Sequence, residues 1–357
     1  MNDTYGGVTY ISTDAHVTEP IDLYRERVDA KYRDRVPWIE EGEGGERTVH
    51  MEGLRPRSLM AAAVLEKAVV GGWDVDMRIR DQERDGVAAE VIFPTWALQA
   101  CFVPEDPGFQ MSMCRAYNDW ATEVFGERAG RTLAVGLIPM LDIDAAVVEA
   151  QRAADLGLRA LFLPAQVPTR PYNDDAYDRF WAAASDLGLP LTFHSGTGVE
   201  PRVVRGPGGA VINYLLAAQL DGPRVMLSLA AGGALDRFPE LRVVTVETGA
   251  SWLAWVMTQA DAIYDAHQMW AKPKLSLKPS ELIRRQCAAT FMHDPVAVAN
   301  REFTGVETLM WGNDYPHPEG TWPNSQDRCA EQFEGVPDAE LAAIVAGNAA
   351  RVFGFDL

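Results

Sequence analysis

Several features are scarce in this sequence of 357 residues, and each scarcity excludes a class of protein. There are 4 cysteines, Cys101, Cys114, Cys287 and Cys329, and no two of them form a CxxC pair. They suit neither a disulfide framework nor a thiolate metal site, so we expect buried thiols in a reducing compartment. No apolar run without charges approaches the roughly 18 residues that a membrane-spanning helix needs.

Positive charge is also scarce. The chain has 32 Lys+Arg against 51 Asp+Glu, a formal net charge of −19. A protein that binds nucleic acid needs a basic face, so we predict no nucleic-acid partner. The first residues, Met1–Gly7, are polar and lack a basic stretch followed by an apolar one. We therefore expect no secretory signal, no membrane partner and a cytoplasmic location.

Short apolar runs rich in β-branched residues alternate with longer helix-like stretches. Runs such as VVTV and LPLTF are apolar throughout, which is typical of parallel strands buried on both faces. Asp142–Leu156 and Asp174–Leu187 are expected to be helices, since each begins on acidic residues and is followed by glycine. The eight apolar runs are Val8–Ser12, Val87–Pro94, Thr132–Pro139, Leu158–Pro164, Pro190–His194, Leu241–Glu247, Ala288–His293 and Thr308–Asp314.

Eight strand–helix repeats predict an α/β fold, specifically a (β/α)₈ TIM barrel. A doubly wound open sheet is disfavoured by this number and by the lack of GxGxxG after the first strand. Residues of about 24–80, with GEGGE, a strand-like RTVHM and charged helical pieces, do not fit a barrel unit. We predict one barrel domain over residues 1–357, with a lid or small subdomain inserted at about 24–80 after strand one and a closing helix at Asn348–Phe355.

Polar residues follow several of the apolar runs, and the carboxyl ends of barrel strands are where catalytic groups lie. Residues i and i+2 of an extended chain point to the same side, so Asp14 and His16 can both face the barrel axis. Such a pair alone is more often structural, but further histidine and carboxylate at other strand ends favour a site for Zn²⁺, Mn²⁺ or Fe²⁺. The strand-end residues are Asp14 and His16 (strand one), His194 (five), Glu247 (six) and Asp314 (eight), with His317 just beyond.

Four segments at these positions together resemble the amidohydrolase-2 family, in the branch that includes aminocarboxymuconate-semialdehyde and resorcylate decarboxylases. They are YISTDAHVTEP, LPLTFHSGTG, FPELRVVTVETGASWL and MWGNDYPHPEGTWP, and the resemblance covers residues of about 8–355. The resemblance implies one divalent metal, zinc preferred and manganese the alternative, held by Asp14, His16, His194 and Asp314. Strand four, RALFLPAQ, lacks the lysine that bridges two metals in binuclear members, which favours a single ion.

Strand six departs from the family pattern, because Glu247 stands where the decarboxylase that names the branch has a histidine. That histidine's mechanism does not transfer unchanged, since a carboxylate serves either as a base or to orient a histidine. We expect Asp314, Glu247 and His317 to be the catalytic residues. His317 is the best further acid or base, because histidine titrates near neutrality.

Two reactions fit these ligands. One is non-oxidative decarboxylation of a small aromatic or unsaturated carboxylic acid chelated to the metal, with Asp314 or His317 protonating the carbon that loses CO₂. The other is hydrolysis of an amide, ester or lactone by metal-activated water, with Asp314 as base. The decarboxylase is favoured on resemblance, and a non-catalytic binding barrel stays open.

The remaining expectations concern partners. We expect a small organic substrate, and candidate contacts for it are Arg202, Arg205, Trp322 and His293. Arginine suits a substrate carboxylate, and tryptophan suits a planar ring. A homodimer is expected only by analogy with related barrels.

Overall fold

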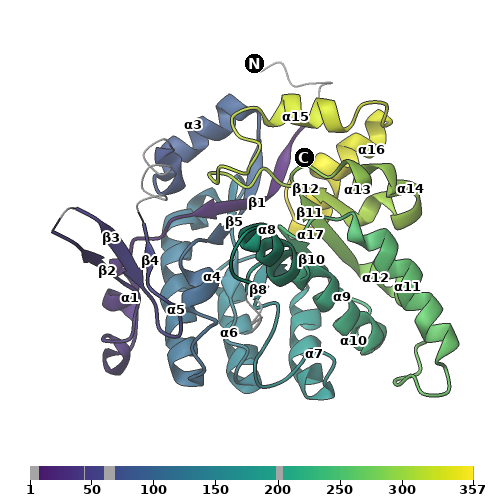
Figure 1. The fold of residues 1–357 in the computed structure, drawn as a ribbon, viewed down its shortest axis with the longest axis horizontal. Helices are drawn as coiled ribbons and strands as arrows, with labels where there is room; N and C mark the ends of the chain where they lie inside the picture. Colours follow the sequence, from purple (N-terminus) through teal and green to yellow (C-terminus); the bar gives the residue numbers. More distant parts are fainter. Residues whose placement is uncertain (1–7, 44, 60–68, 198–203, 357) are drawn as a thin grey trace.

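Parallel strands alternate with helices along most of the chain (Figure 1). The computed structural model describes residues 8–43, 45–59, 69–197 and 204–356. Each of the eight predicted runs corresponds to a strand, and the third is broken in two. The strands are β1 Ile11–Val17, β5 Ala89–Pro94, β6 Thr132–Ala134, β7 Gly136–Leu137, β8 Leu161–Leu163, β9 Leu191–His194, β10 Val243–Val246, β11 Cys287–Phe291 and β12 Leu309–Trp311.

Hydrogen bonds connect these strands in the order β1-β5-β6 and β7-β8-β9-β10-β11-β12. At the break in the third strand, the backbone nitrogen of Val135 donates to β5, and that of Gly136 donates to Ala160 beside β8. At this point the backbone stops pairing with β5 on one side and begins to pair with β8 on the other.

The ring of strands closes where the first strand meets the chain after the last strand. The backbone nitrogen of Asp314 donates to the Asp14 carbonyl at 2.8 Å, and that of His16 donates to the Tyr315 carbonyl at 2.6 Å. The predicted TIM barrel is confirmed. The first strand, however, runs through Asp14 and His16 rather than ending at Ser12, because pairing with β5 and with Tyr315 extends it.

Helices surround the strands (Figure 1). The two helices predicted from their capping residues are confirmed: Asp142 caps α6 by accepting from two backbone nitrogens, and α7 ends at Gly188, whose φ is +66°. The helices are α1 Asp22–Arg27, α3 Val75–Asp85, α4 Ala97–Ala100, α5 Pro107–Phe125, α6 Ile143–Asp155, α7 Asp178–Leu187, α8 Gly209–Asn213, α9 Asp221–Ala231, α10 Ala234–Arg237, α11 Trp252–Ala266, α12 Pro279–Gln286, α13 Pro295–Ala299, α14 Arg301–Thr304, α15 Ser325–Gln332, α16 Asp338–Ala342 and α17 Asn348–Phe353.

The segment predicted as an insertion contains a small antiparallel sheet at one side of the barrel (Figure 1). Its strands are β2 Trp38–Glu41, β3 Arg47–His50 and β4 Arg57–Ser58, in that order. The expected end at about residue 80 lies inside α3, whose N-terminus is capped by Asp74. Helix α3 leads directly into β5, so it belongs to the barrel repeat and the irregular segment stops before it.

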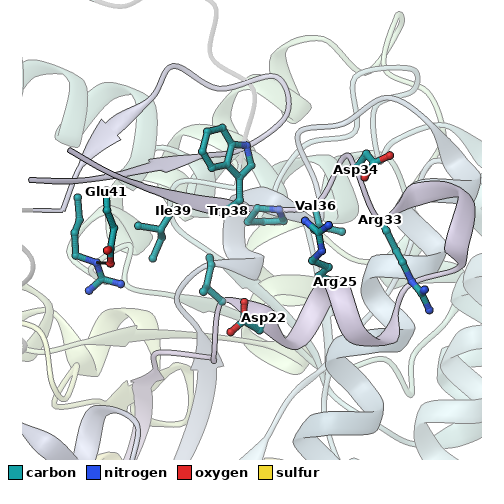
Figure 2. A pocket seen from close by; sticks show the side chains of 11 residues that line it. Asp22, Arg25, Arg33, Asp34, Val36, Trp38, Ile39 and Glu41 are labelled. Carbon is teal, nitrogen blue, oxygen red and sulfur yellow. Dashed lines mark ion pairs between the residues drawn. The ribbon is translucent and has the colours of Figure 1, made fainter. Parts of the chain in front are cut away.

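A groove of about 430 Å³ lies beside this small sheet (Figure 2). Arg25, Arg33 and Trp38 are among the residues that line it. None of the strand-end polar residues contributes to its wall, so the groove is separate from the candidate site.

The four cysteines are free and buried, as the sequence predicted. Among the described helices, none combines the length and the apolar character needed to cross a bilayer.

Candidate metal centre

Strand β1 carries Asp14 and His16 at the barrel end where the strand-end polar groups meet. Its pairing with β5 shifts register between Ser12 and Ala15, an irregularity of the kind that re-aims side chains near functional sites. Gly312 lies so close that a Cβ there would stand 2.6 Å from the Cβ of Asp14. Only glycine allows the chain after β12 to approach Asp14 this closely.

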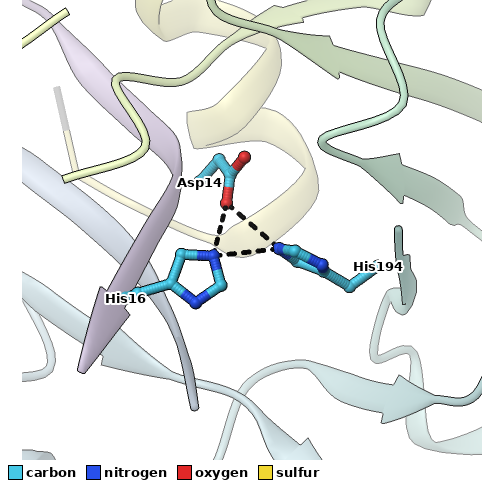
Figure 3. Close-up of side chains that lie close together, drawn as sticks. All are labelled: Asp14, His16 and His194. Atoms are coloured by element: carbon cyan, nitrogen blue, oxygen red, sulfur yellow. Dashed lines mark hydrogen bonds and ion pairs between the residues drawn. The ribbon is translucent and has the colours of Figure 1, made fainter. Parts of the chain in front are cut away.

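His16 and His194 face each other across the barrel (Figure 3). Their Nε2 atoms are 3.0 Å apart, and both side chains are buried. The Nδ1 atom of His16 lies 3.2 Å from the Pro94 carbonyl, and that of His194 lies 3.0 Å from the Ser195 carbonyl. Because a carbonyl only accepts, each Nδ1 carries the proton, and both Nε2 atoms are left to share a proton or a cation.

Three carboxylates complete the cluster. Asp14 Oδ1 lies 3.6 Å from His16 Nε2 and 3.5 Å from His194 Nε2, and Asp314 Oδ1 lies 3.6 Å from His16 Nε2. Glu247 Oε2 lies 3.3 Å from His194 Nε2. Asp14 Oδ1 and Asp314 Oδ2 are buried and accept no hydrogen bond from the described residues, so they are available to a cation.

The backbone is left-handed at two of these carboxylates. Glu247 and Asp314 have φ values of +54° and +53°, in a region that residues other than Gly, Asn and Asp rarely adopt, so the strain lies at Glu247. Asn313, next to Asp314, accepts from the Ser12 hydroxyl at 2.8 Å and so attaches this turn to β1. The surrounding structure therefore holds both carboxylates toward the cluster.

The ionisation of the cluster reflects its burial. Burial lowers the pKa of His16 well below the ordinary value for histidine. Burial also raises the pKa values of Glu247 and Asp314, and the negative charge of Asp14 raises the pKa of Asp314 further. Burial alone would lower the pKa of His194, but contact with Asp14 and the charge of Glu247 outweigh it and raise the pKa to about 9. In the absence of metal, His194 therefore holds the one proton between the two rings and donates it to His16.

The donor set fits a divalent cation. Ligand atoms of Asp14, His16 and His194 lie within 4.8 Å of one another, as do those of Asp14, Glu247 and Asp314. Imidazole nitrogen with carboxylate oxygen is a set that binds zinc and manganese. The four residues predicted as ligands are thus brought together, and Glu247 joins them.

His317 lies at the edge of this cluster. Its Nδ1 is 2.8 Å from Asp314 Oδ1, its ring centroid is 4.2 Å from that of His16, and its side chain is 30% exposed. It therefore links a buried carboxylate to solvent, the position that the sequence predicted for an acid or base.

The predicted substrate contacts are placed less closely. Arg202 lies outside the described residues, while Arg205 and His293 are exposed. Trp322 packs against Ala15 and Tyr315, and Ala15 points away from the face that Asp14 and His16 share. Contact of these four residues with a substrate stays a prediction.

Two side chains that contact residues of the cluster were not predicted from the sequence. Buried Arg78 bonds Glu90 at 2.6 Å and also donates to the His16 carbonyl. Tyr214 donates to Glu247 at 2.5 Å. Arg78 lies in a charged helix and Tyr214 in an apolar segment, so neither stands out without knowledge of the fold.

Comparisons with known proteins find similar sequences and similar folds. A curated relative, 2-amino-3-carboxymuconate-6-semialdehyde decarboxylase of Dictyostelium discoideum, is 22% identical over 293 residues, 80% of this chain and 77% of that protein. Two solved structures share the fold. Amidohydrolase map2389c from Mycobacterium avium subsp. paratuberculosis K-10 has a TM-score of 0.79 at 19% identity and covers 98% of this chain and 99% of its own. A 5-carboxyvanillate decarboxylase from Novosphingobium aromaticivorans DSM 12444 with bound manganese has a TM-score of 0.72 at 15% identity and covers 99% of both chains.

A family model also matches nearly the whole chain. The amidohydrolase-2 model, described as amidohydrolase, matches residues 13–355, which include every residue of the cluster. The chain belongs to the amidohydrolase-2 family of metal-dependent enzymes.

Proposed function

We propose that the protein is a metal-dependent decarboxylase that acts on a small aromatic or unsaturated carboxylic acid. The observation that carries this proposal is the meeting of two facing imidazole nitrogens and two buried carboxylate oxygens without a hydrogen-bond partner among the described residues. The named activities of the Dictyostelium and Novosphingobium relatives support decarboxylation as the reaction.

In this proposal Asp14, His16, His194 and Asp314 hold a single divalent ion. When bound, the ion keeps the substrate's carboxylate and a neighbouring oxygen in place and offsets their negative charge. From the sequence, zinc was the preferred metal and manganese the alternative. The carboxylate-rich surroundings and the manganese of the Novosphingobium enzyme favour manganese instead.

The protein's own residues supply the proton. As CO₂ leaves, the electron pair of the broken carbon–carbon bond stays on the substrate carbon, which takes up a proton from Asp314. The contact of Asp314 with His317 and its place among the candidate ligands support this role. His317 then returns a proton from solvent to Asp314 through the contact at Nδ1. Arg202, Arg205, Trp322 and His293 are the proposed substrate contacts.

The test is a product assay on metal-loaded protein. CO₂ release is measured with 5-carboxyvanillate, dihydroxybenzoates and aminocarboxymuconate semialdehyde, beside a panel of amides, esters and lactones. We expect CO₂ release that a chelator abolishes and Mn²⁺ restores, and that Asp314→Asn lowers by about 100-fold or more. Hydrolysis without CO₂ release would establish the alternative, hydrolysis by metal-activated water. Stoichiometric metal with neither reaction would indicate a binding protein.

A further inference from the structure

A segment over residues 204–220, helical from Gly209 to Gln219, lies against the candidate metal centre. Helix α8 continues into a π-helical turn, Tyr214–Gln219, and in Figure 1 the α8 label stands at the centre of the ring of strands. Most large side chains here are apolar and exposed: Val211, Ile212, Leu215, Leu216 and Leu220. Tyr214 differs from them because its hydroxyl reaches into the site.

The hydroxyl of Tyr214 contacts only one of the two carboxylate oxygens of Glu247. It donates to Oε1 at 2.5 Å, while Oε2 lies 3.3 Å from His194 Nε2. The two carboxylate oxygens of Glu247 therefore have different surroundings. Oε1 is hydrogen-bonded to the helical segment, and Oε2 faces the cluster.

The segment is held internally and is followed by a close approach to the chain beside Glu247. Within the segment, the side chain of Asn213 donates to the Val204 carbonyl and accepts from the Val204 nitrogen, each at 2.9 Å. Just after the segment, a Cβ on Gly222 would meet the hydroxyl of Thr248, the residue after Glu247, at 2.5 Å. The position of Tyr214 relative to Glu247 is therefore built into the fold.

From this geometry we propose that Tyr214 is a positioning residue, which orients Glu247 so that Oε2 faces the metal and the substrate. The inference rests on the proposed metal centre but not on the reaction assigned to it. Removing the hydroxyl removes the contact at Oε1 and leaves Glu247 held only by His194 at Oε2, while the aromatic ring of residue 214 is kept. Loss of an outer partner of this kind typically weakens metal affinity about 10–100-fold.

The test is a double-mutant cycle on Mn²⁺ affinity, with free Mn²⁺ measured by electron paramagnetic resonance. The proteins are the wild type, Tyr214→Phe, Glu247→Ala and the double variant. We expect Tyr214→Phe to raise the Mn²⁺ dissociation constant about tenfold, and to have no further effect when Glu247 is already Ala, which has no oxygen to accept from the hydroxyl. Tyr264→Phe is the matched control. Tyr264 lies on the outer helix α11, and its hydroxyl accepts from the backbone nitrogen of Leu275, so losing that hydroxyl should leave the Mn²⁺ affinity unchanged.

The outcomes separate this inference from the proposed function. An unchanged affinity in Tyr214→Phe, or an equal loss in both backgrounds, would overturn the role of Tyr214 while the metal centre stands. Wild-type protein that binds no Mn²⁺ would overturn both. The expected coupling in a protein that releases no CO₂ would support Tyr214 and remove only the decarboxylase assignment.

Discussion

The imidazole rings of His16 and His194 stand edge to face, with centroids 4.8 Å apart and planes at 88°. Each ring is fixed by a backbone carbonyl at Nδ1, so neither is free to turn its Nε2 away from the other. Two lone pairs at this distance repel unless a positive charge lies between them. At the scale of single residues, the site is therefore built to hold a cation, and the proton on His194 takes its place when no metal is bound.

Replacing one of these rings should remove the metal. We expect His194→Ala to weaken Mn²⁺ binding by more than 100-fold, beyond the effect of losing an outer partner. Equilibrium dialysis followed by metal analysis measures this. His50→Ala is the control, since His50 pairs with Glu40 in the small sheet. Stoichiometric metal in His194→Ala would show that the ion is held elsewhere.

The pKa of His194 makes metal binding depend on pH. With a pKa of about 9, His194 is protonated at neutral pH and must lose this proton to become a ligand. The apparent Mn²⁺ affinity should therefore rise with pH, about tenfold per unit up to pH of about 9, and level off above it. Calorimetry in two buffers of different ionisation enthalpy counts the released protons. Binding without proton release would contradict the assignment.

At the scale of structural elements, helix α3 connects the ligand strand to its neighbour. Arg78 projects from α3 and bonds Glu90 of β5, while it donates to the carbonyls of Gly71 and of the ligand His16. Its guanidinium also lies 4.9 Å from the centroid of Tyr315, in the loop that follows Asp314. One buried cation thus contacts two of the chain segments that carry candidate ligands, β1 and the loop after β12.

Removing this cation should be costly. Arg78→Met leaves the carboxylate of Glu90 buried without its ion pair, and we expect the free energy of unfolding to fall by about 3–5 kcal/mol. Urea unfolding of the metal-free protein measures it. Arg128→Met, which breaks an exposed pair with Asp76, should cost less than about 1 kcal/mol. Equal losses in the two variants would show that the buried pair has no special role.

At the scale of the whole molecule, the candidate ligands come from β1, β9, the end of β10 and the loop after β12. These elements are far apart in the sequence and meet only because the barrel closes. An ion held there would join both sides of the ring, and its binding energy would add to the stability of the folded state. It would also offset part of the negative charge that gathers in the site of this acidic chain.

Metal removal should therefore lower the melting temperature. At free Mn²⁺ of 100 times the dissociation constant, binding contributes about 2.7 kcal/mol, which corresponds to about 4 °C for a chain of this length. Differential scanning calorimetry with and without a chelator measures the shift, and His194→Ala should show none. An equal shift in that variant would place the stabilising ion outside the centre.

Much of the fold and of the site followed from the sequence. The eight strands were predicted because buried parallel strands are apolar throughout, and the cluster because the carboxyl ends of such strands share one end of a barrel. The boundary of β1 was wrong, since Asp14 and His16 look like a strand end when read as polar residues. Pairing with β5 and Tyr315 extends the strand through them.

The order of apolar and polar residues along the chain by itself determined the barrel and which strand-end side chains gather in the cluster, because both depend on local periodicity and topology. Only the tertiary structure decided which further side chains act on these ligands. Tyr214 lies 33 residues from Glu247, and Arg78 lies 62 from His16. No spacing rule joins such pairs, since their contact depends on how helices pack over the closed ring of strands.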